Sequence, residues 1–240
     1  MIKRGRATLI IRSVEMVINK IGQQHIDYGV NCQDYGIVNN SFKLVCDGCS
    51  EGKHSEVGAK TFCHLFEQSI LNVPDEATHQ EYVSELTRKI FNEYLLPAYG
   101  QTAESIKNHL CFTIMVVHEK TDSFVVSYCG DGYIIKQKQS GDILFEEITD
   151  GEYPKYFVYN YVDKEHLSNY VDGVDFTTVA FSKEEYSNIG IASDGLRFID
   201  KNPENRGEFI ELLKNNKSVA LKRLINKHQP IFKDDITIIF

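Results

Sequence analysis

The sequence lacks a long uninterrupted apolar segment. No apolar run approaches the roughly 18 residues that a membrane-spanning helix needs. The stretch that follows the basic N-terminal residues is interrupted by Arg12 and Glu15. No small-residue cleavage site follows it, so the features of a secretory signal peptide are missing. We therefore expect a cytoplasmic protein with no membrane segment.

The sequence also lacks an excess of basic residues. It contains 26 Lys and Arg against 34 Asp and Glu, which gives a formal net charge of −8. This balance argues against a nucleic-acid backbone as the principal partner. Part of the excess acid could instead be neutralised by bound cations. Six cysteines are present, and without a secretory signal we expect free thiols and no disulfide framework.

No linker divides the chain, because it has no tract rich in Pro, Gly or Ser, no long charge run and no internal repeat of useful length. Its 240 residues are 42% hydrophobic and 25% charged, as in one large soluble domain. We expect residues 1–240 to form that single domain. The aromatic-rich segment at about 149–172 is interpreted as a strand followed by a surface flap, a flap-like insertion in the domain.

Hydrophobic periodicity arranges the chain in blocks of helices and blocks of strands. Helical spacing predicts a helix at 55–71 and another at 79–96 that is ended by Pro97. Two shorter helices are predicted near 205–215 and 217–228. Because helices and strands do not alternate, an α+β fold with antiparallel sheets is favoured over a doubly wound parallel sheet. The predicted strands are 36–46 (with a turn at Asn39-Asn40), 111–118, 123–130, 132–138, 143–148, 174–181, 187–193 and 236–240.

An aspartate stands at the end of several predicted strands. Asp47, Asp131 and Asp194 each close a β-rich run and precede a glycine, while Asp34 and Asp234 each precede a strand. Taken singly, each is more often a turn residue than a ligand. Gathered at one sheet edge, these carboxylates would repel one another unless cations neutralised them. Oxygen-only ligation suits Mg²⁺ or Mn²⁺, and two such ions roughly 3.5–4 Å apart stabilise an in-line displacement at phosphorus.

Five motifs in order resemble those of the PP2C-type (metal-dependent) protein serine/threonine phosphatases, in particular their bacterial branch. The likeness runs from about residue 22 to 240 and includes His25 and Gly151-Glu152-Tyr153. The five motifs are Asn31-Cys32-Gln33-Asp34; Val45-Cys46-Asp47-Gly48 with Ser55-Glu56-Val57-Gly58-Ala59 behind it; Cys129-Gly130-Asp131-Gly132; Ala192-Ser193-Asp194-Gly195-Leu196; and Asp234-Asp235-Ile236-Thr237.

The resemblance implies both a fold and a chemistry. The fold would be a four-layer α/β/β/α sandwich of two antiparallel sheets flanked by helices, with the metals in a cleft at one end of the sheets. Asp47 would bridge two metal ions, Mg²⁺ or Mn²⁺, and the Gly48 carbonyl would bind one of them. Asp194 and Asp234 would complete the shell of the first ion. A metal-bridging hydroxide would then hydrolyse a phosphomonoester without a phosphoenzyme.

The same resemblance implies further roles and partners. Asp34 would lie close to the second ion, through water, and Asp131 with Asp194 would hold a third, weaker ion. The catalytic set would then be Asp47, Asp194 and Asp34. The substrate would be a phosphorylated protein, with a serine/threonine kinase as a partner, so the protein would act in signalling.

Two positions depart from the eukaryotic members of that family. Cys49 stands where those members have a histidine proposed to protonate the leaving group, and Gly29 stands where they have a phosphate-binding arginine. His25 and His54 are candidates for these tasks, as is a metal-bound water. These two departures leave open an alternative to an active phosphatase, namely a pseudophosphatase in which the fold serves as an interaction module.

The segment Gly48-Cys49-Ser50-Glu51-Gly52 also fits the Gly-x-Ser-x-Gly nucleophile elbow of serine hydrolases. Ser50 would then be the nucleophile and His228 its base. No convincing oxyanion loop precedes the elbow, and the strand-end aspartates would be unexplained. Cys46 and Cys49 form a Cys-x-x-Cys pair, but no second pair of zinc ligands stands out. We interpret both cysteines as packing thiols.

Overall fold

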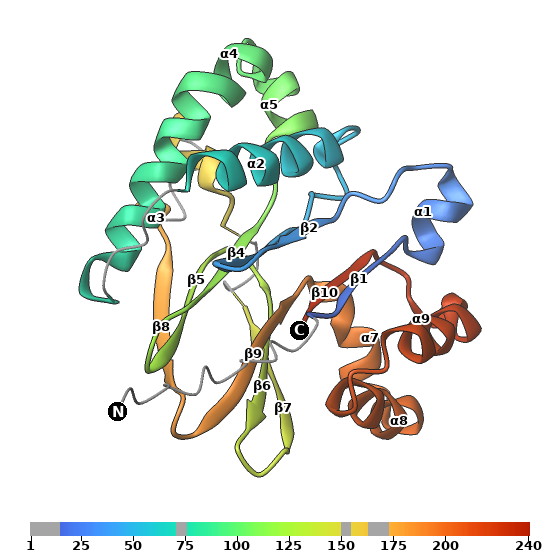
Figure 1. Cartoon of the computed structure of the whole chain (residues 1–240). Helices are drawn as coiled ribbons and strands as arrows, with labels where there is room; N and C mark the ends of the chain where they lie inside the picture. The colour runs from blue at the N-terminus through green and yellow to red at the C-terminus, as the bar shows by residue number, and fades with distance from the viewer. Residues whose placement is uncertain (1–14, 71–75, 150–154, 163–172) are drawn as a thin grey trace, which may run out of the picture.

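Two five-stranded antiparallel sheets lie at the centre of the molecule, as Figure 1 shows. The computed structural model describes residues 15–70, 76–149, 155–162 and 173–240. The strand orders are β1-β10-β9-β6-β7 in the first sheet and β2-β3-β4-β5-β8 in the second. The two antiparallel sheets predicted from the sequence are therefore confirmed.

All strands except β1, which was not predicted, follow the predicted β-rich runs closely. The first sheet contains β1 (Val17–Lys20), β10 (Ile236–Ile239), β9 (Tyr186–Ala192), β6 (Gly132–Lys138) and β7 (Ile143–Ile148). The second contains β2 (Tyr35–Val38), β3 (Phe42–Cys46), β4 (Ile114–Glu119), β5 (Ser123–Cys129) and β8 (Thr177–Ser182). The predicted turn at Asn39-Asn40 joins β2 to β3, and the Asn39 side chain accepts the amide of Ser41 at 2.8 Å.

Helices cover the outer face of each sheet and complete the four layers (Figure 1). Over the second sheet lie α2 (Ser55–Ser69), α3 (Glu76–Ile90), the π-helical turn η1 (Phe91–Leu95), α4 (Leu96–Tyr99) and α5 (Ala103–His109). Over the first lie η3 (Asp194–Leu196), α7 (Arg197–Asp200), α8 (Pro203–Lys214), α9 (Ser218–Lys227) and η4 (Gln229–Ile231). The short helix α1 (Gln23–Tyr28) stands at the edge, beyond β1.

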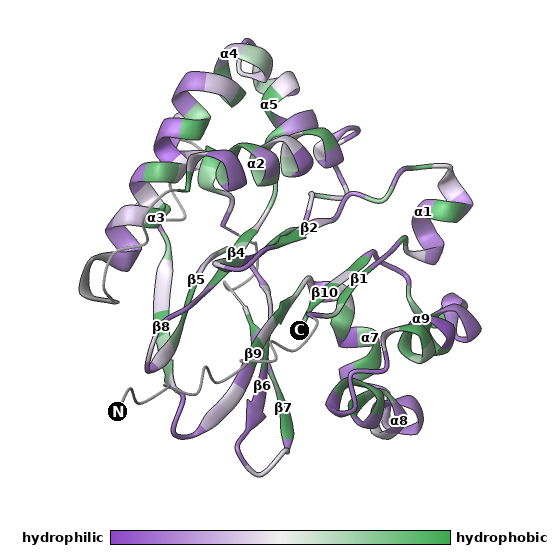
Figure 2. Cartoon of the chain, in the orientation of Figure 1, coloured by the Kyte–Doolittle hydropathy of each residue, from purple (hydrophilic) through white to green (hydrophobic). Residues whose placement is uncertain are grey.

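Three hydrophobic clusters hold the layers together. Val126 and Ile191 belong to the cluster between the two sheets. Phe62 belongs to the cluster between the second sheet and its helices, and Phe209 to the one between the first sheet and its helices. Figure 2 shows hydrophobic and hydrophilic residues alternating along these helices, as expected where only one face is buried.

The helix predicted to stop at Pro97 instead continues to Tyr99. Residues Phe91–Leu95 form a turn of π-helix, and Pro97 stands in the first turn of α4. The π-helical turn just before Pro97 interrupts the regular i→i−4 hydrogen bonds, which a residue without an amide proton could not continue. The prediction that Pro97 ends the helix was therefore wrong.

The segment interpreted as a strand and surface flap at 149–172 is described at residue 149 and at 155–162. That second part holds the 3-10 helix η2 (Phe157–Tyr161), not a strand. Phe157 is 1% exposed, and its ring lies 5.5 Å from that of Phe91. The Asn160 amide donates to the carbonyls of Phe157 and Val174 at 3.0 and 2.7 Å. The rest of the segment, including Gly151-Glu152-Tyr153, lies outside the described residues.

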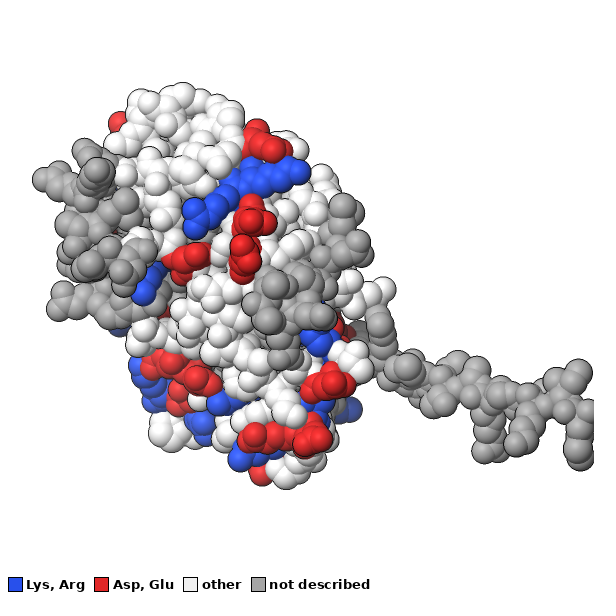
Figure 3. All heavy atoms as spheres, turned by 90° about the vertical axis from the view of Figure 1, so that its left-hand side faces the viewer, with Lys and Arg blue, Asp and Glu red and all other residues white. Residues whose placement is uncertain are grey.

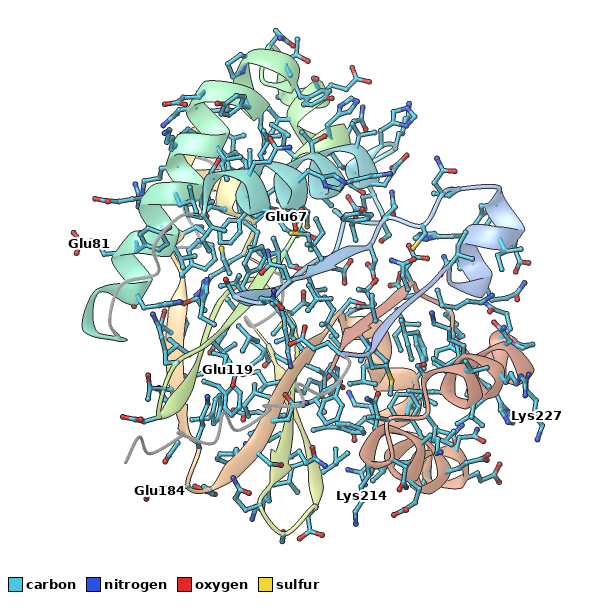
Figure 4. All side chains as sticks on the ribbon, viewed as in Figure 1. Glu67, Glu81, Glu119, Glu184, Lys214 and Lys227 are labelled. Atoms are coloured by element: carbon cyan, nitrogen blue, oxygen red, sulfur yellow. The ribbon has the colours of Figure 1, made fainter. Side chains whose placement is uncertain are left out.

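The outer surface carries charges of both signs. On the face shown in Figure 3, acidic and basic residues of the described part are interspersed and form no broad basic area. Lys214 and Lys227 occupy the last turns of α8 and α9 and point away from the protein in Figure 4. A cation at that end of a helix interacts favourably with the helix dipole. Among the described helices, none combines the length and the apolar character needed to cross a membrane.

Candidate metal centre

A cavity of about 380 Å³ is lined by residues from the strand ends of both sheets. Asp47 and Gly48 follow β3, Asp131 lies between β5 and β6, and Asp194 begins η3 after β9. Asp234 comes shortly before β10. Within the described part of the chain, no Lys, Arg or His lines this cavity. The fold therefore brings four of the aspartates singled out in the sequence into one place.

Asp34 is buried behind Asp47. It is 4% exposed, its carboxylate interacts with that of Asp47, and the Ser193 hydroxyl donates to its Oδ2 at 2.6 Å. Its Oδ1 is buried without a hydrogen-bond partner in the described residues. Burial raises the pKa of Asp34 to about 7, and the nearby charge of Asp235 adds to the rise. Asp34 therefore lies against the cavity but is not one of the residues that line it.

The carboxylates destabilise one another's charged forms. Burial raises the pKa of Asp47 well above its usual range, and the charges of Asp34 and Asp234 raise it further. A bound cation reverses this effect, because it favours the ionised carboxylate. The donor set consists of carboxylates and backbone carbonyls, which are the oxygen ligands that Mg²⁺ and Mn²⁺ prefer. In its chemistry the cavity fits these ions.

The side chains that line the cavity nevertheless do not form a complete metal-coordination site in this structure. Within the described residues, no three His, Cys, Asp or Glu side chains are grouped so that they could hold one ion. Two contacts account for this. The Asp47 carboxylate interacts with Asp34, and the Asp194 carboxylate contacts the guanidinium of Arg197. A hydrogen bond or a neighbouring positive charge stabilises a carboxylate.

Gly48 is fixed at a position where only glycine fits. Its amide donates to the Gln33 carbonyl at 3.2 Å, and it forms an isolated bridge with Phe112. A Cβ on Gly48 would lie 2.6 Å from the Ser55 hydroxyl and 2.8 Å from the Gln33 carbonyl oxygen. The amide of Thr113 donates to the Asp47 carbonyl at 2.8 Å. The strand end that carries Asp47 is thus held from both sides.

Asp235 holds the segments around the cavity in place, a role that sequence reasoning missed. It is 1% exposed and accepts the amides of Gly22 and Gln33 at 2.7 and 2.5 Å. On the other side, a Cβ on Gly195 would collide with the Asp235 carbonyl oxygen. The loop after Asp194 therefore approaches the start of β10 as closely as a glycine allows. The Asp234-Asp235 pair was the available signal, but the motif assigns a ligand role to its first member only.

The structure brings neither histidine candidate to the carboxylates. His25 is 6% exposed, and its Nδ1 lies 2.9 Å from Asp235 Oδ1. The adjacent Asp235 carboxylate raises the pKa of His25, against the lowering effect of burial. The His54 side chain is 58% exposed and lies 3.9 Å from Glu56. Neither residue lines the cavity, so their assignment as proton donor or phosphate ligand gains no geometric support.

Other residues near the cavity carried no signal recognised in the sequence. Arg197 Nε donates to the Asp194 carbonyl at 3.1 Å, and its guanidinium contacts the Asp194 carboxylate. Its position three residues after Asp194 on the same helical turn is the signal that could have found it. Tyr156 and Tyr159 line the cavity together with Cys49. Burial, and then the neighbouring Cys49 thiol, raise the pKa of Tyr156.

The serine-hydrolase interpretation of Ser50 was wrong. Ser50 lines the cavity, but the sheets are antiparallel and form a sandwich, whereas a nucleophile elbow belongs to a largely parallel sheet. Its proposed base, His228, caps α9 in the helical layer over the first sheet. All six cysteines are free, as predicted, and Cys46 is fully buried as a packing thiol.

Solved bacterial phosphatases share this fold. The serine/threonine phosphatase Stp1 from Staphylococcus aureus is 17% identical, with 99% of this chain and 98% of that chain covered and a TM-score of 0.64. The Mycobacterium tuberculosis serine/threonine phosphatase PstP/Ppp is 13% identical, with 94% and 96% covered and a TM-score of 0.66. The PstP catalytic domain in complex with two manganese ions is 14% identical, with 94% and 96% covered and a TM-score of 0.62.

No curated protein matches the sequence. A family model does: the one described as Protein phosphatase 2C matches residues 21–228. This range contains the motifs around Asp34, Asp47, Asp131 and Asp194. The chain therefore belongs to the protein phosphatase 2C family, the family that its motifs predicted, and is a protein phosphatase.

Proposed function

We propose that this protein hydrolyses phosphoserine and phosphothreonine in proteins and that the reaction depends on Mg²⁺ or Mn²⁺. The observation that carries the proposal is the convergence of four aspartates from both sheets in a cavity lined by no cationic side chain of the described part. The PstP domain of the same fold, solved with two manganese ions, supports the choice of metal. We further propose a single domain over residues 1–240, a cytoplasmic location and substrates shared with a serine/threonine kinase.

The proposed ligands would hold the divalent cations that the reaction needs. Bound divalent cations would lower the pKa of water and neutralise the phosphoryl charge during an in-line displacement. Without them the carboxylates would repel an anionic phosphate, so the metal-free cavity should not bind substrate. Asp47 interacts electrostatically with Asp34, Asp234 and Asp131 and is the proposed bridging ligand. The other proposed ligands are Gly48, Asp194 and Asp234 for the first ion, Asp34 through water for the second, and Asp131 with Asp194 for a third.

Hydrolysis of p-nitrophenyl phosphate tests this proposal. We expect activity with Mn²⁺, loss of activity with EDTA, and a decrease of at least about 100-fold in Asp47→Asn, because loss of outer-shell partners alone costs up to that much. Ser50→Ala should stay active. Asp122→Asn, the same change at an exposed turn aspartate, is the matched control and should match the wild type.

Calorimetric titration with Mn²⁺ gives a readout that needs no turnover. The wild type should bind Mn²⁺ and Asp47→Asn should bind it far more weakly. Activity that is lost in Ser50→Ala and does not depend on metal would overturn the proposal. Mn²⁺ binding by a folded protein that hydrolyses no phosphate ester would instead identify the pseudophosphatase interaction module.

A further inference from the structure

A second cavity, of about 240 Å³, adjoins the carboxylate cavity. Four residues line both of them: Cys49, Glu51, Tyr156 and Tyr159. The two spaces therefore share one wall. A ligand held at the carboxylates could reach the second space without crossing the protein interior.

The second cavity differs from the first in chemistry. Ala103, Ile106 and Val162 line it, and no aspartate does. Its only basic lining residue in the described part, Lys107, pairs with Glu51 at 2.9 Å. Both of these side chains are more than half exposed, so the ion pair lies toward solvent. The remaining lining residues are aliphatic side chains, two tyrosines and two cysteine thiols, none of which carries a formal charge when protonated.

The walls of the second cavity are held in place by packing and hydrogen bonds. Tyr156 precedes η2, whose Phe157 packs 5.5 Å from the Phe91 ring and 5.6 Å from that of Phe176. On the opposite side, the Thr102 hydroxyl caps α5 by accepting the Ser105 amide at 3.0 Å. The cavity is therefore formed before any ligand binds, which lowers the entropic cost of binding.

We propose that the second cavity binds an apolar side chain of the substrate protein, one or two residues from its phosphorylated Ser or Thr. This inference rests on the proposed function of the first cavity. Consecutive Cα atoms are 3.8 Å apart, so a neighbouring residue must lie beside the carboxylate cavity when the phosphate is in it. A charged substrate side chain would lose its hydration there without gaining a partner, because Lys107 and Glu51 already satisfy each other.

The test uses phosphoserine peptides with a polar background and one leucine moved through the two positions on each side of the phosphoserine. We expect one position at which leucine raises kcat/KM about 10-fold over alanine, the scale of apolar contacts in a pocket. Ala103→Phe should fill the cavity and remove this preference, because Ala103 is exposed at the start of α5 and tolerates a larger side chain. The matched control is Ala98→Phe, at an exposed alanine of α4 that does not line the cavity.

Two readouts separate this inference from the proposed function. Hydrolysis of p-nitrophenyl phosphate should be equal in wild type, Ala103→Phe and Ala98→Phe, because this substrate has no neighbouring residues. Fluorescence anisotropy with the unphosphorylated peptides should show tighter binding of the leucine peptide to the wild type and Ala98→Phe but not to Ala103→Phe, and it needs neither metal nor turnover. Aryl phosphatase activity without leucine preference overturns the subsite alone. Leucine preference that persists in Ala103→Phe places the contact elsewhere and also overturns it.

Discussion

We expect a buried pair of histidines to make the stability of this protein sensitive to acid. His79 of α3 is 0% exposed and His118 of β4 is 1% exposed. His79 Nε2 lies 2.5 Å from His118 Nδ1, and His79 Nδ1 lies 2.9 Å from the Ser127 hydroxyl. The Nε2 of His118 is buried without a partner in the described residues. Neither ring can take a second proton without burying a charge.

The magnitude of the effect follows from the two pKa values. Burial lowers the pKa of His79 to about 4 and that of His118 to about 3, while an unperturbed histidine titrates near 6.5. Between these values the unfolded chain binds more protons than the folded one. The stability contributed by the neutral pair is therefore complete above pH 6.5 and is lost as the pH falls toward 4 and 3. At about pH 5 the loss is about 2 kcal/mol for each histidine and about 4 kcal/mol for both.

Urea unfolding followed by far-UV circular dichroism measures this loss, since the chain has no Trp to report by fluorescence. Between about pH 7.5 and about pH 5, the wild type should lose about 4 kcal/mol more than His79→Leu/His118→Leu. The double variant shares every other titrating group, so the aspartates of the cavity cancel in the difference. Ser127 keeps its 2.7 Å bond to the Thr178 hydroxyl in the variant. Equal pH dependence in both proteins would refute the assignment of a buried neutral pair.

Three further outcomes are expected. Gly58→Ala places a Cβ against the His109 carbonyl oxygen and should lower the free energy of unfolding by about 3 kcal/mol. Gly207→Ala, at an open site in α8, should raise it by about 0.5–1 kcal/mol. Thermal unfolding of the two variants measures both effects. His25→Gln should lower the free energy of unfolding by about 1–3 kcal/mol and leave the pH profile of kcat unchanged. His54→Gln should change neither the stability nor the pH profile. A shifted pH profile in His25→Gln would support His25 as a proton donor. Mn²⁺ at about 100 times its Kd should add about 2.7 kcal/mol to the free energy of unfolding, measured by urea titration with and without EDTA.

The features predictable from the sequence were those whose cause is local. Asp47 and Asp194 stand at the ends of strands whose apolar patterns are clear, so their placement at strand ends could be expected from the order of residues alone. Their strands belong to different sheets, and the apolar patterns do not show that these two strand ends meet. β1 and α1 have four and six residues, too few for a periodic pattern to be recognised. The role of Asp235 depends on its contact with Gly22, 213 positions away in the chain. No local pattern encodes such a contact, because it forms only when β1 and β10 pair.

The division of the cavity between two sheets has a consequence for the hydrophobic core. Asp47 is attached to the second sheet, and Asp194 and Asp234 to the first, so the spacing of these carboxylates is set by how the sheets pack. Side chains such as Val126 and Ile191 in the inter-sheet cluster set the distance between the sheets, although they do not line the cavity. We expect that adding or removing one methylene there would shift the sheets relative to each other and so change the spacing of the carboxylates. Substitutions that alter the carboxylate cavity are therefore to be sought in the middle of the sandwich as well as at its rim.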